Sequence, residues 1–247
     1  MLLSNEHSPI NVNQSSTRHP TTTSIPAILA TNLSKSVGDE ANRIDILSSL
    51  QLQVSLGESV AIVGSSGSGK STLLGLLAGL DQPTSGSVTV KGAAFSNLDE
   101  DARAAIRGEN MGFVFQSFQL LPTMTALENV MLPMQLANQA NAKQVATTTL
   151  EKVGLGARLT HYPKQLSGGE QQRVAIARAF ASQPAILFAD EPTGNLDLTT
   201  GERIIELLFD LNHAAGTTLI LVTHDMKLAE RCQRILTLNN GQLSESV

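Results

Sequence analysis

The chain of 247 residues is 41% hydrophobic and 16% charged, with a formal net charge of −5. This composition is ordinary for a globular protein that buries a sizeable core. The acidic balance and the lack of Trp argue against nucleic acid as a partner, because nucleic-acid-binding surfaces usually combine a basic excess with stacking aromatic side chains. The single cysteine, Cys232, cannot form an internal disulfide, and we interpret it as a plain thiol in a helix, in keeping with a reducing compartment.

The first 26 residues are rich in Ser, Thr, Asn and Gln. They have little apolar surface to bury, so residues 1–26 are predicted to be a disordered tail and residues 27–247 the folded domain. No stretch of the sequence approaches the ~20 apolar residues that cross a bilayer, and the tail lacks the apolar core of a secretory signal. We therefore expect any membrane role to come through a partner chain.

After the tail, short strands and one helix are predicted up to residue 90. Apolar residues alternate with polar ones over 50–56, which is the period of a half-buried strand. Residues 60–63 form a continuous apolar run, typical of a strand that is buried on both faces. The predicted elements of this part are strands at 27–33, 50–56 and 60–63, an edge strand around Val88 and Val90, and a helix at 71–80.

The rest of the chain alternates between helices and short apolar strands. A helix at 125–138 is expected to bend or break at Pro133, because proline lacks the backbone N–H. Residues 239–241, Asn-Asn-Gly, predict the turn of a closing hairpin. Further helices are predicted at 142–153, 170–181, 201–213 and 226–231, and further strands at 112–115, 185–189, 218–222 and 235–238.

Together these elements predict an α/β fold. Apolar runs that lack alternation and are separated by helices indicate a mainly parallel sheet with helices on both faces. The alternating strands in the first 95 residues predict an added antiparallel β layer. The helix-dominated segment 117–167 is predicted to form a helical subdomain of its own.

Residues 64–71 read Gly-Ser-Ser-Gly-Ser-Gly-Lys-Ser and match the phosphate-binding pattern G-x-x-x-x-G-K-[ST], between a predicted strand and a predicted helix. The glycines let successive backbone N–H groups converge on phosphate oxygens, assisted by the N-terminus of the following helix. Lys70 would reach the β- and γ-phosphates, and the Ser71 hydroxyl would bind Mg²⁺. The alternative, a Gly/Ser turn that happens to contain a lysine, leaves the flanking strand and helix unexplained. The predicted phosphate-contacting residues are Gly64, Ser65, Ser66, Gly67, Ser68, Gly69, Lys70, Ser71 and Thr72.

Two adjacent carboxyl groups, Asp190 and Glu191, follow the apolar strand predicted at 185–189. Two adjacent side chains at the end of a strand can take different roles in hydrolysis. Asp190 would support Mg²⁺, while Glu191 would orient and deprotonate an attacking water. Acidic residues often simply end strands, so the prediction depends on the phosphate-binding loop that accompanies them.

Residues 166–173 read Leu-Ser-Gly-Gly-Glu-Gln-Gln-Arg, and with this pattern the chain resembles the ABC ATPase family over about residues 27–245. Gln116 corresponds to the glutamine of the family's Q-loop, Asp197 to the aspartate of its D-loop and His224 to its switch histidine. The resemblance implies a P-loop NTPase core of the RecA-like type that binds ATP with Mg²⁺ and hydrolyses it.

In this family two nucleotide-binding domains pair head to tail around two ATP molecules, so the resemblance implies a homodimer. Ser167, Gly168 and Gly169 precede a predicted helix, whose N–H groups and dipole suit the γ-phosphate held by the other protomer. His224 would contact the same phosphate and help to position Glu191. In isolation, His224 could also be a satisfied histidine at a strand end.

The resemblance assigns three further contacts. Gln116 is implied to bind Mg²⁺ together with Ser71 and Asp190, and to transmit movement into the helical segment. Asp197 is implied to contact the nucleotide at the dimer interface.

Adenine recognition departs from the family pattern, which usually stacks an aromatic residue on the base. By position that residue is Val37, and no Phe, Tyr or Trp occurs before Phe95. Arg43 is an alternative, because its planar guanidinium can also stack on a ring.

Residues 112–118 (GFVFQSF), 125–130 (TALENV) and 190–197 (DEPTGNLD) are similar to the branch of lipoprotein-release and macrolide-export ATPases, and within it to the YbbA-type ATPases. The resemblance implies an integral-membrane permease of the FtsX/MacB type as partner, and a place on the cytoplasmic face of the inner membrane. The alternative is an ATP-driven regulatory or force-transmitting partner of a membrane protein, without substrate transport. The apolar residues after the Q-loop glutamine either dock a helix of that partner or fill the core of the helical subdomain; they are Phe118, Leu120, Leu121, Pro122 and Met124.

Overall fold

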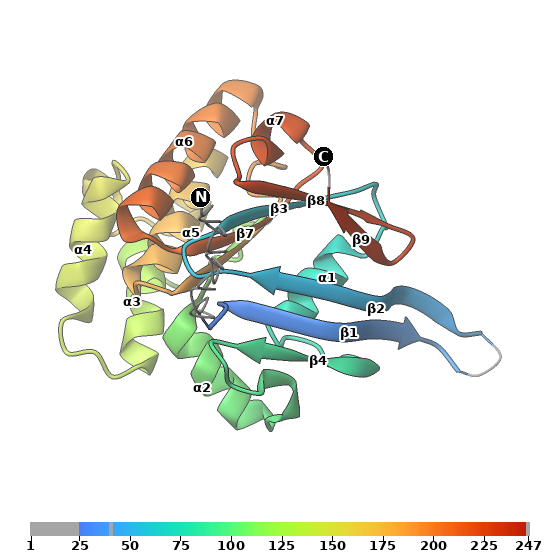
Figure 1. Cartoon of the computed structure of the whole chain (residues 1–247). Helices are drawn as coiled ribbons and strands as arrows, with labels where there is room; N and C mark the ends of the chain where they lie inside the picture. The colour runs from blue at the N-terminus through green and yellow to red at the C-terminus, as the bar shows by residue number, and fades with distance from the viewer. Residues whose placement is uncertain (1–24, 40–41, 246–247) are drawn as a thin grey trace, which may run out of the picture.

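Two β-sheets and a layer of helices make up the fold (Figure 1). The computed structural model describes residues 25–39 and 42–245. Most of the predicted tail, residues 1–24, lies outside the described residues. The predicted α/β class, with a parallel sheet, an antiparallel sheet and helices, is confirmed.

The larger sheet has six strands in the order β5-β6-β7-β3-β8-β9; the first five are parallel, and β9 runs antiparallel to β8. Every residue of β3 and β7 is buried, as the continuous apolar runs predict. Val60 and Ile62 of β3 belong to one apolar cluster, and Ala61 and Val63 belong to a second cluster that includes residues of α5 and α6. The strands are β3 (Ser59–Val63), β5 (Met111–Phe115), β6 (Ile186–Asp190), β7 (Thr218–Val222), β8 (Arg234–Asn239) and β9 (Gln242–Glu245).

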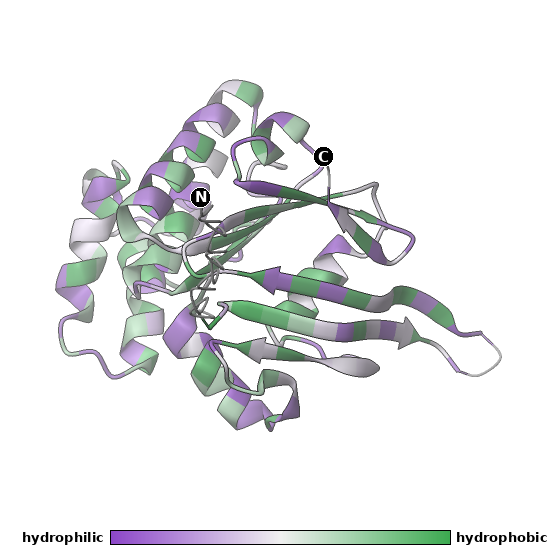
Figure 2. Cartoon of the chain, viewed as in Figure 1, coloured by the Kyte–Doolittle hydropathy of each residue, from purple (hydrophilic) through white to green (hydrophobic). Residues whose placement is uncertain are grey.

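The smaller sheet is antiparallel, in the order β2-β1-β4, which confirms the predicted antiparallel layer with an edge strand. Its strands are β1 (Ile28–Val37), β2 (Ile44–Val54) and β4 (Ser85–Val90). Buried and exposed residues alternate over 50–54, and Figure 2 shows the same alternation of hydropathy along β2. The strands β1 and β2 are longer than predicted, because polar pairs such as Ser36 and Asp45 continue the ladder past the apolar core.

Helices pack on both sheets, with α1 lying between the two (Figure 1). They are α1 (Lys70–Leu77), α2 (Glu100–Asn110), α3 (Ala126–Leu136), α4 (Ala142–Lys152), α5 (Gly168–Ala181), α6 (Leu198–Ala215) and α7 (Met226–Ala229). The sequence did not predict α2, because its residues are mostly polar and Arg103 is the one buried residue in it. Helix α3 continues through Pro133 to Leu136, so the predicted break at the proline is wrong, while a bend there stays a prediction.

Helix α5 begins at Gly168, before the predicted start at residue 170, because Ser167 caps it. The Ser167 hydroxyl accepts a hydrogen bond from the Glu170 N–H at 3.3 Å, and the Glu170 carboxylate accepts one from the Ser167 N–H at 2.9 Å. This reciprocal capping box satisfies two backbone donors at the helix N-terminus.

Helices α3, α4 and α5 share one apolar cluster, to which α3 contributes Val130 and Met134, α4 contributes Leu150 and α5 contributes Val174. The buried Asn129 of α3 also fixes the loop before that helix, since its side chain bonds both the N–H and the C=O of Leu121. The helical layer thus includes α5, while the predicted subdomain limits of 117–167 stay a prediction.

Candidate functional site

The loop between β3 and α1 has a backbone that only glycine adopts easily at several positions. Gly67 and Gly69 have φ angles of 77° and 98°, in the left-handed region that disfavours side chains. A Cβ atom on Gly64 would lie 2.4 Å from the carbonyl oxygen of Leu238, so the loop also packs too closely on β8 for a side chain there. The pattern of glycines recognised in the sequence is therefore required by the geometry of the loop.

Two side chains of this loop fit an anionic ligand. The Lys70 ammonium donates hydrogen bonds to the carbonyl oxygens of Gly64 and Ser65, each at 2.9 Å, which holds its charge over the loop. The buried hydroxyl of Ser68 has no hydrogen-bond partner among the described residues. A phosphate group would give both side chains acceptor oxygens, with the N-terminus of α1 beside them.

Ser71 and Asp190 are the pair best suited to a hard cation. The Ser71 hydroxyl donates a hydrogen bond to the Asp190 carboxylate. Burial raises the pKa of Asp190 above its usual range, the neighbouring Glu191 charge adds to the rise, and the Ser71 hydrogen bond and Lys70 oppose it. A half-buried carboxylate beside a hydroxyl fits Mg²⁺, which prefers a few oxygen ligands and takes the rest from water or phosphate. Elsewhere in residues 25–39 and 42–245, no cluster of three or more His, Cys, Asp or Glu side chains could hold a metal ion.

The sheet brings the other predicted residues to the same place. Strands β5, β6 and β7 are parallel neighbours, so the residues that follow them meet at one edge of the sheet. A cleft of about 630 Å³ opens there. Its lining residues are Ile46, Ser66, Gly67, Gly69, Lys70, Ser71, Thr72, Gln116, Asp190, Glu191 and His224.

Glu191 is held in place by its backbone and by its side chain. Its φ angle of 45° lies in the left-handed region, and its N–H donates to the carbonyl oxygen of Val222 at 2.9 Å. One carboxylate oxygen lies 2.7 Å from Nδ1 of His224, and the other accepts a hydrogen bond from the Thr223 hydroxyl at 3.4 Å. The exposed His224 thus contacts Glu191, which favours a functional interpretation over that of a histidine satisfied at a strand end.

Several predicted site residues do not line the cleft. Ser167, Gly168 and Gly169 lie at the start of α5, where a Cβ on Gly169 would come within 2.5 Å of the Thr200 side chain. Asp197 caps α6 by accepting a hydrogen bond from the Thr200 N–H at 3.0 Å. Within one chain, these residues belong to a surface separate from the phosphate loop.

The adenine prediction is likewise not supported by the cleft lining, which includes Ile46 but neither Val37 nor Arg43. Arg43 forms an exposed ion pair with Asp45 at 2.8 Å. Ile46 contacts the phosphate loop directly, since a Cβ on Gly69 would lie 3.0 Å from its side chain.

Asn195 is a contact that sequence reasoning missed. Its side-chain amide donates to the backbone oxygen of Gln116 at 2.9 Å and accepts from the Gln116 side chain at 3.3 Å. Asn195 lies in the loop that precedes Asp197, but nothing in the sequence pairs it with a residue 79 positions earlier.

Cys232 lies outside the cleft, and burial raises the pKa of its thiol to about 12. A thiol with so high a pKa is a poor nucleophile. Its interpretation as a plain thiol is confirmed, but α7 ends at Ala229, so Cys232 lies after the helix and not in it as predicted.

Comparison with known proteins decides the family. The sequence model of the ABC transporter family matches residues 47–194. The chain belongs to this family. It is 57% identical to the ABC transporter ATP-binding protein YbbA of Escherichia coli K12 over 216 residues, which cover 87% of this chain and 95% of that protein. It is 52% identical over 217 residues to the ATP-binding protein LolD of the lipoprotein-releasing system of Pseudomonas syringae pathovar tomato, covering 87% of this chain and 96% of LolD.

Solved structures agree. The fold matches the ATP-binding cassette MJ0796, captured as a dimer in a post-hydrolysis state with ADP and phosphate, with a TM-score of 0.82 and 41% identity over 89% of this chain and 97% of the cassette. The predicted family, cassette fold and ATPase class are therefore confirmed, and the chain is the ATP-binding subunit of an ABC transporter. Among the described residues, no helix combines the length and the apolar character needed to cross a membrane.

The Asp190→Asn substitution should stabilise the nucleotide-free and metal-free protein. Because the folded pKa of Asp190 lies above its usual value of 3.8, the charged carboxylate costs stability at every pH above that folded pKa. We expect a higher melting temperature than wild type at pH 7 in the presence of a chelator, with the difference shrinking as the pH falls toward 4.

Asp45→Asn is the matched control. Hydrogen bonds from Ser36 and Arg43 lower the pKa of Asp45, so the sign of its effect should be opposite. A lower melting temperature for Asp190→Asn at pH 7 would show that the charged Asp190 carboxylate does not destabilise the folded protein.

Proposed function

We propose that this ABC subunit hydrolyses ATP at two composite sites formed by two copies of the chain. The observation that carries the proposal is the division of the predicted residues. Lys70, Ser71 and Glu191 share one cleft, whereas the loop that begins α5 lies outside it. A second copy, placed head to tail, would supply that loop to the open side of the cleft. The related cassette MJ0796 has been captured as a dimer, which supports this arrangement.

In each site, the residues of the cleft would hold Mg²⁺-ATP. The backbone of the phosphate loop and Lys70 would bind the β- and γ-phosphates, and the Ser68 hydroxyl would gain a partner that the part of the chain described in the structure does not give it. Ser71, Asp190 and Gln116 would hold Mg²⁺. When bound, the metal ion neutralises phosphate charge and polarises the bond to the γ-phosphorus.

Glu191 would act as the general base. It would accept a proton from the attacking water, whose oxygen bonds to the γ-phosphorus while the bond to the bridging oxygen breaks, giving ADP and phosphate. His224 donates to the Glu191 carboxylate across 2.7 Å when Nδ1 carries the proton, which fixes the orientation of the base. His224 is also exposed and lines the cleft, where it would contact the γ-phosphate.

The partner copy would complete the site with Ser167, Gly168 and Gly169. Helix α5 is 14 residues long, and its N-terminus presents backbone N–H groups and a partial positive charge. These groups suit the γ-phosphate of the neighbouring site. Asp197 begins α6 beside this loop and would face the same interface.

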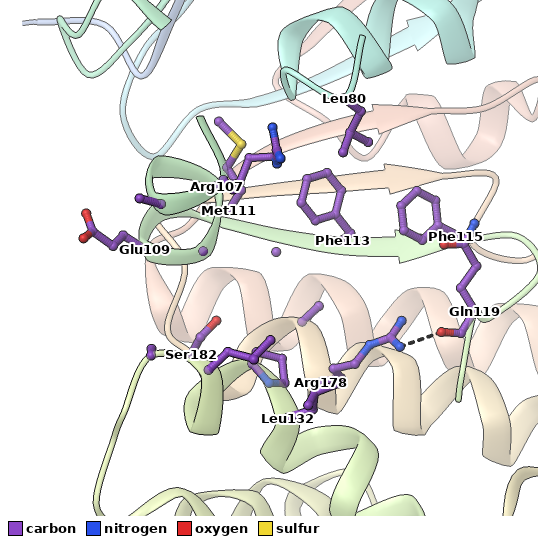
Figure 3. A pocket seen from close by; sticks show the side chains of 18 residues that line it. Leu80, Arg107, Glu109, Met111, Phe113, Phe115, Gln119, Leu132, Arg178 and Ser182 are labelled. Carbon is purple, nitrogen blue, oxygen red and sulfur yellow. Dashed lines mark hydrogen bonds between the residues drawn. The ribbon is translucent and has the colours of Figure 1, made fainter. Parts of the chain in front are cut away.

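A second surface fits the membrane partner. A groove of about 720 Å³ lies between β5 and the helices α2, α3 and α5, with Phe113 and Phe115 on one side and Leu132 and Arg178 on the other (Figure 3). Leu136 of α3 lines this groove and is 76% exposed. An amphipathic cytoplasmic helix of a permease would cover this apolar surface.

The groove is connected to the hydrolysis site through β5, which ends immediately before Gln116. Of the apolar residues predicted near the partner, Leu120 packs against the cluster of α3, α4 and α5, while Leu121 stays 40% exposed. Leu120 therefore fills the core of the helical layer, while docking of the partner on Leu121 stays a proposal.

We propose a permease of the FtsX/MacB type as the partner and the cytoplasmic face of the inner membrane as the location. The similarity to LolD, an ATP-binding protein of a lipoprotein-releasing system, supports this partner class. Force transmission to a membrane protein without transport is the alternative, and the two differ in whether a substrate moves when ATP is hydrolysed.

The Glu191→Gln substitution should preserve ATP binding and lower the turnover rate by ~10²–10⁴-fold, the usual cost of losing a positioned general base. The unhydrolysed ATP should hold two copies together, which sedimentation can detect. Glu206→Gln on the exposed face of α6 is the control and should behave as wild type. Near wild-type turnover in Glu191→Gln would remove Glu191 from this role.

The Leu136→Lys substitution should abolish co-purification with a co-expressed FtsX/MacB-type permease and leave the melting temperature unchanged, because a charge on the groove must be desolvated by the docking helix. Leu56→Lys replaces another exposed leucine, 55% exposed at the turn before β3, and should leave co-purification intact. Failure of wild type to bind such a permease would contradict the partner class, and binding by Leu136→Lys would contradict the groove.

A further inference from the structure

Gln172 is a fully buried amide in the second turn of α5. Its Nε2 donates a hydrogen bond of 2.5 Å to the backbone oxygen of Pro192, 20 residues along the chain. Its Oε1 is buried and has no hydrogen-bond partner among the described residues. A half-satisfied amide costs stability that an apolar side chain of the same length would not. Stability of the fold therefore does not explain the hydrogen bond to Pro192, and another role is needed.

Pro192 immediately follows Glu191, whose backbone is in the left-handed region at a φ angle of 45°. A residue before proline is disfavoured in the right-handed helical region, and a non-glycine residue in the left-handed region must be held there by its surroundings. Three hydrogen bonds hold this turn. The Glu191 N–H bonds Val222, the Gly194 N–H bonds the Glu191 oxygen at 3.0 Å, and Gln172 bonds Pro192.

The first two bonds come from the strand end and from the turn itself, whereas the third comes from α5. This helix is capped by Ser167 and also carries Arg178, which donates to the backbone oxygen of Gln119 in the loop after Gln116 (Figure 3) and to that of Phe118. Helix α5 is thus bonded to the loops that follow both β5 and β6.

We propose that Gln172 is a positioning residue for Glu191. Its hydrogen bond attaches the turn at residues 191–192, which carries the Glu191 carboxylate, to α5, the helix that Ser167 caps. This inference rests on the proposed function, in which Glu191 is the general base. In the proposed dimer, α5 serves one nucleotide with its N-terminus and supports through Gln172 the base that acts on the other. Gln172 therefore links the two hydrolysis sites through a single helix.

Gln172→Met tests the proposal, because methionine keeps the length of the side chain and removes both polar groups. We expect kcat to fall by about ten- to a hundredfold, as small misplacements of a reacting group do. The KM for ATP should stay within about twofold of the wild-type value. The melting temperature should fall no further than that of the control variant, Asn212→Leu. Gln172→Leu provides the same comparison if the methionine variant does not fold.

Asn212→Leu is the matched control, since Asn212 is also a buried amide whose side-chain oxygen lacks a partner among the described residues. Asn212 does not line the cleft, and it lies about 20 Å along α6 from the helix N-terminus that Asp197 caps, at a rise of ~1.5 Å per residue. We expect its kcat to equal that of wild type whatever happens to its melting temperature.

A double-mutant cycle separates this inference from the proposed function. In the Glu191→Gln background, Gln172→Met should cause no further loss of turnover, because the group that it positions is already gone. Wild-type kcat for Gln172→Met, or an equal loss in both backgrounds, would overturn the positioning role. Near wild-type turnover of Glu191→Gln itself would instead overturn the role of Glu191.

Discussion

Asp190 and Glu191 place two carboxyl groups at one strand end, and the phosphate loop would bring a polyanion to the same edge of the sheet. Carboxylates and phosphates that lie close together repel strongly unless positive charges or oriented dipoles lie between them. The chain supplies Lys70, the N-terminus of α1 and the Ser71 hydroxyl for this purpose. Burial is the main cause of the raised pKa of Asp190, and the Glu191 charge adds to it, so the proposed Mg²⁺ would stabilise the charged carboxylate.

In the proposed function, the same constraint explains why one chain would be insufficient. A γ-phosphate beside Glu191 would need further donors on its open side, and the N-terminus of α5, which Ser167 caps, has backbone N–H groups that suit it. Close packing of Gly169 against Thr200 fixes that N-terminus to α6, away from the cleft of the same chain. In the proposed dimer, a second copy of the chain would therefore meet an electrostatic demand of the first, and α5 would join the two sites through its hydrogen bonds to the loops after β5 and β6.

Local pattern predicted most of this architecture. The buried run of β3, the glycines after it and the carboxyl groups after β6 are local patterns, and most residues that line the cleft were named from them. Tertiary contacts were not. The mostly polar helix α2 has no apolar stripe to reveal it, Ile46 lines the cleft in place of Val37, and the Asn195 and Gln172 contacts join residues far apart in sequence. The limits of the predicted helical subdomain and the roles of the site residues remain predictions.

The composite site is the central claim, and mixing two inactive variants tests it most directly. Lys70→Ala disables the phosphate loop, and Ser167→Arg blocks the N-terminus of α5, so each homodimer should be inactive. A mixed dimer has one site with both lesions and one with neither, and the account predicts that mixing restores ATP hydrolysis. Mixed dimers that are shown to form and yet hydrolyse no ATP would contradict the account. Either Lys70 and Ser167 would not belong to opposite sides of a shared site, or one intact site would not be enough for hydrolysis.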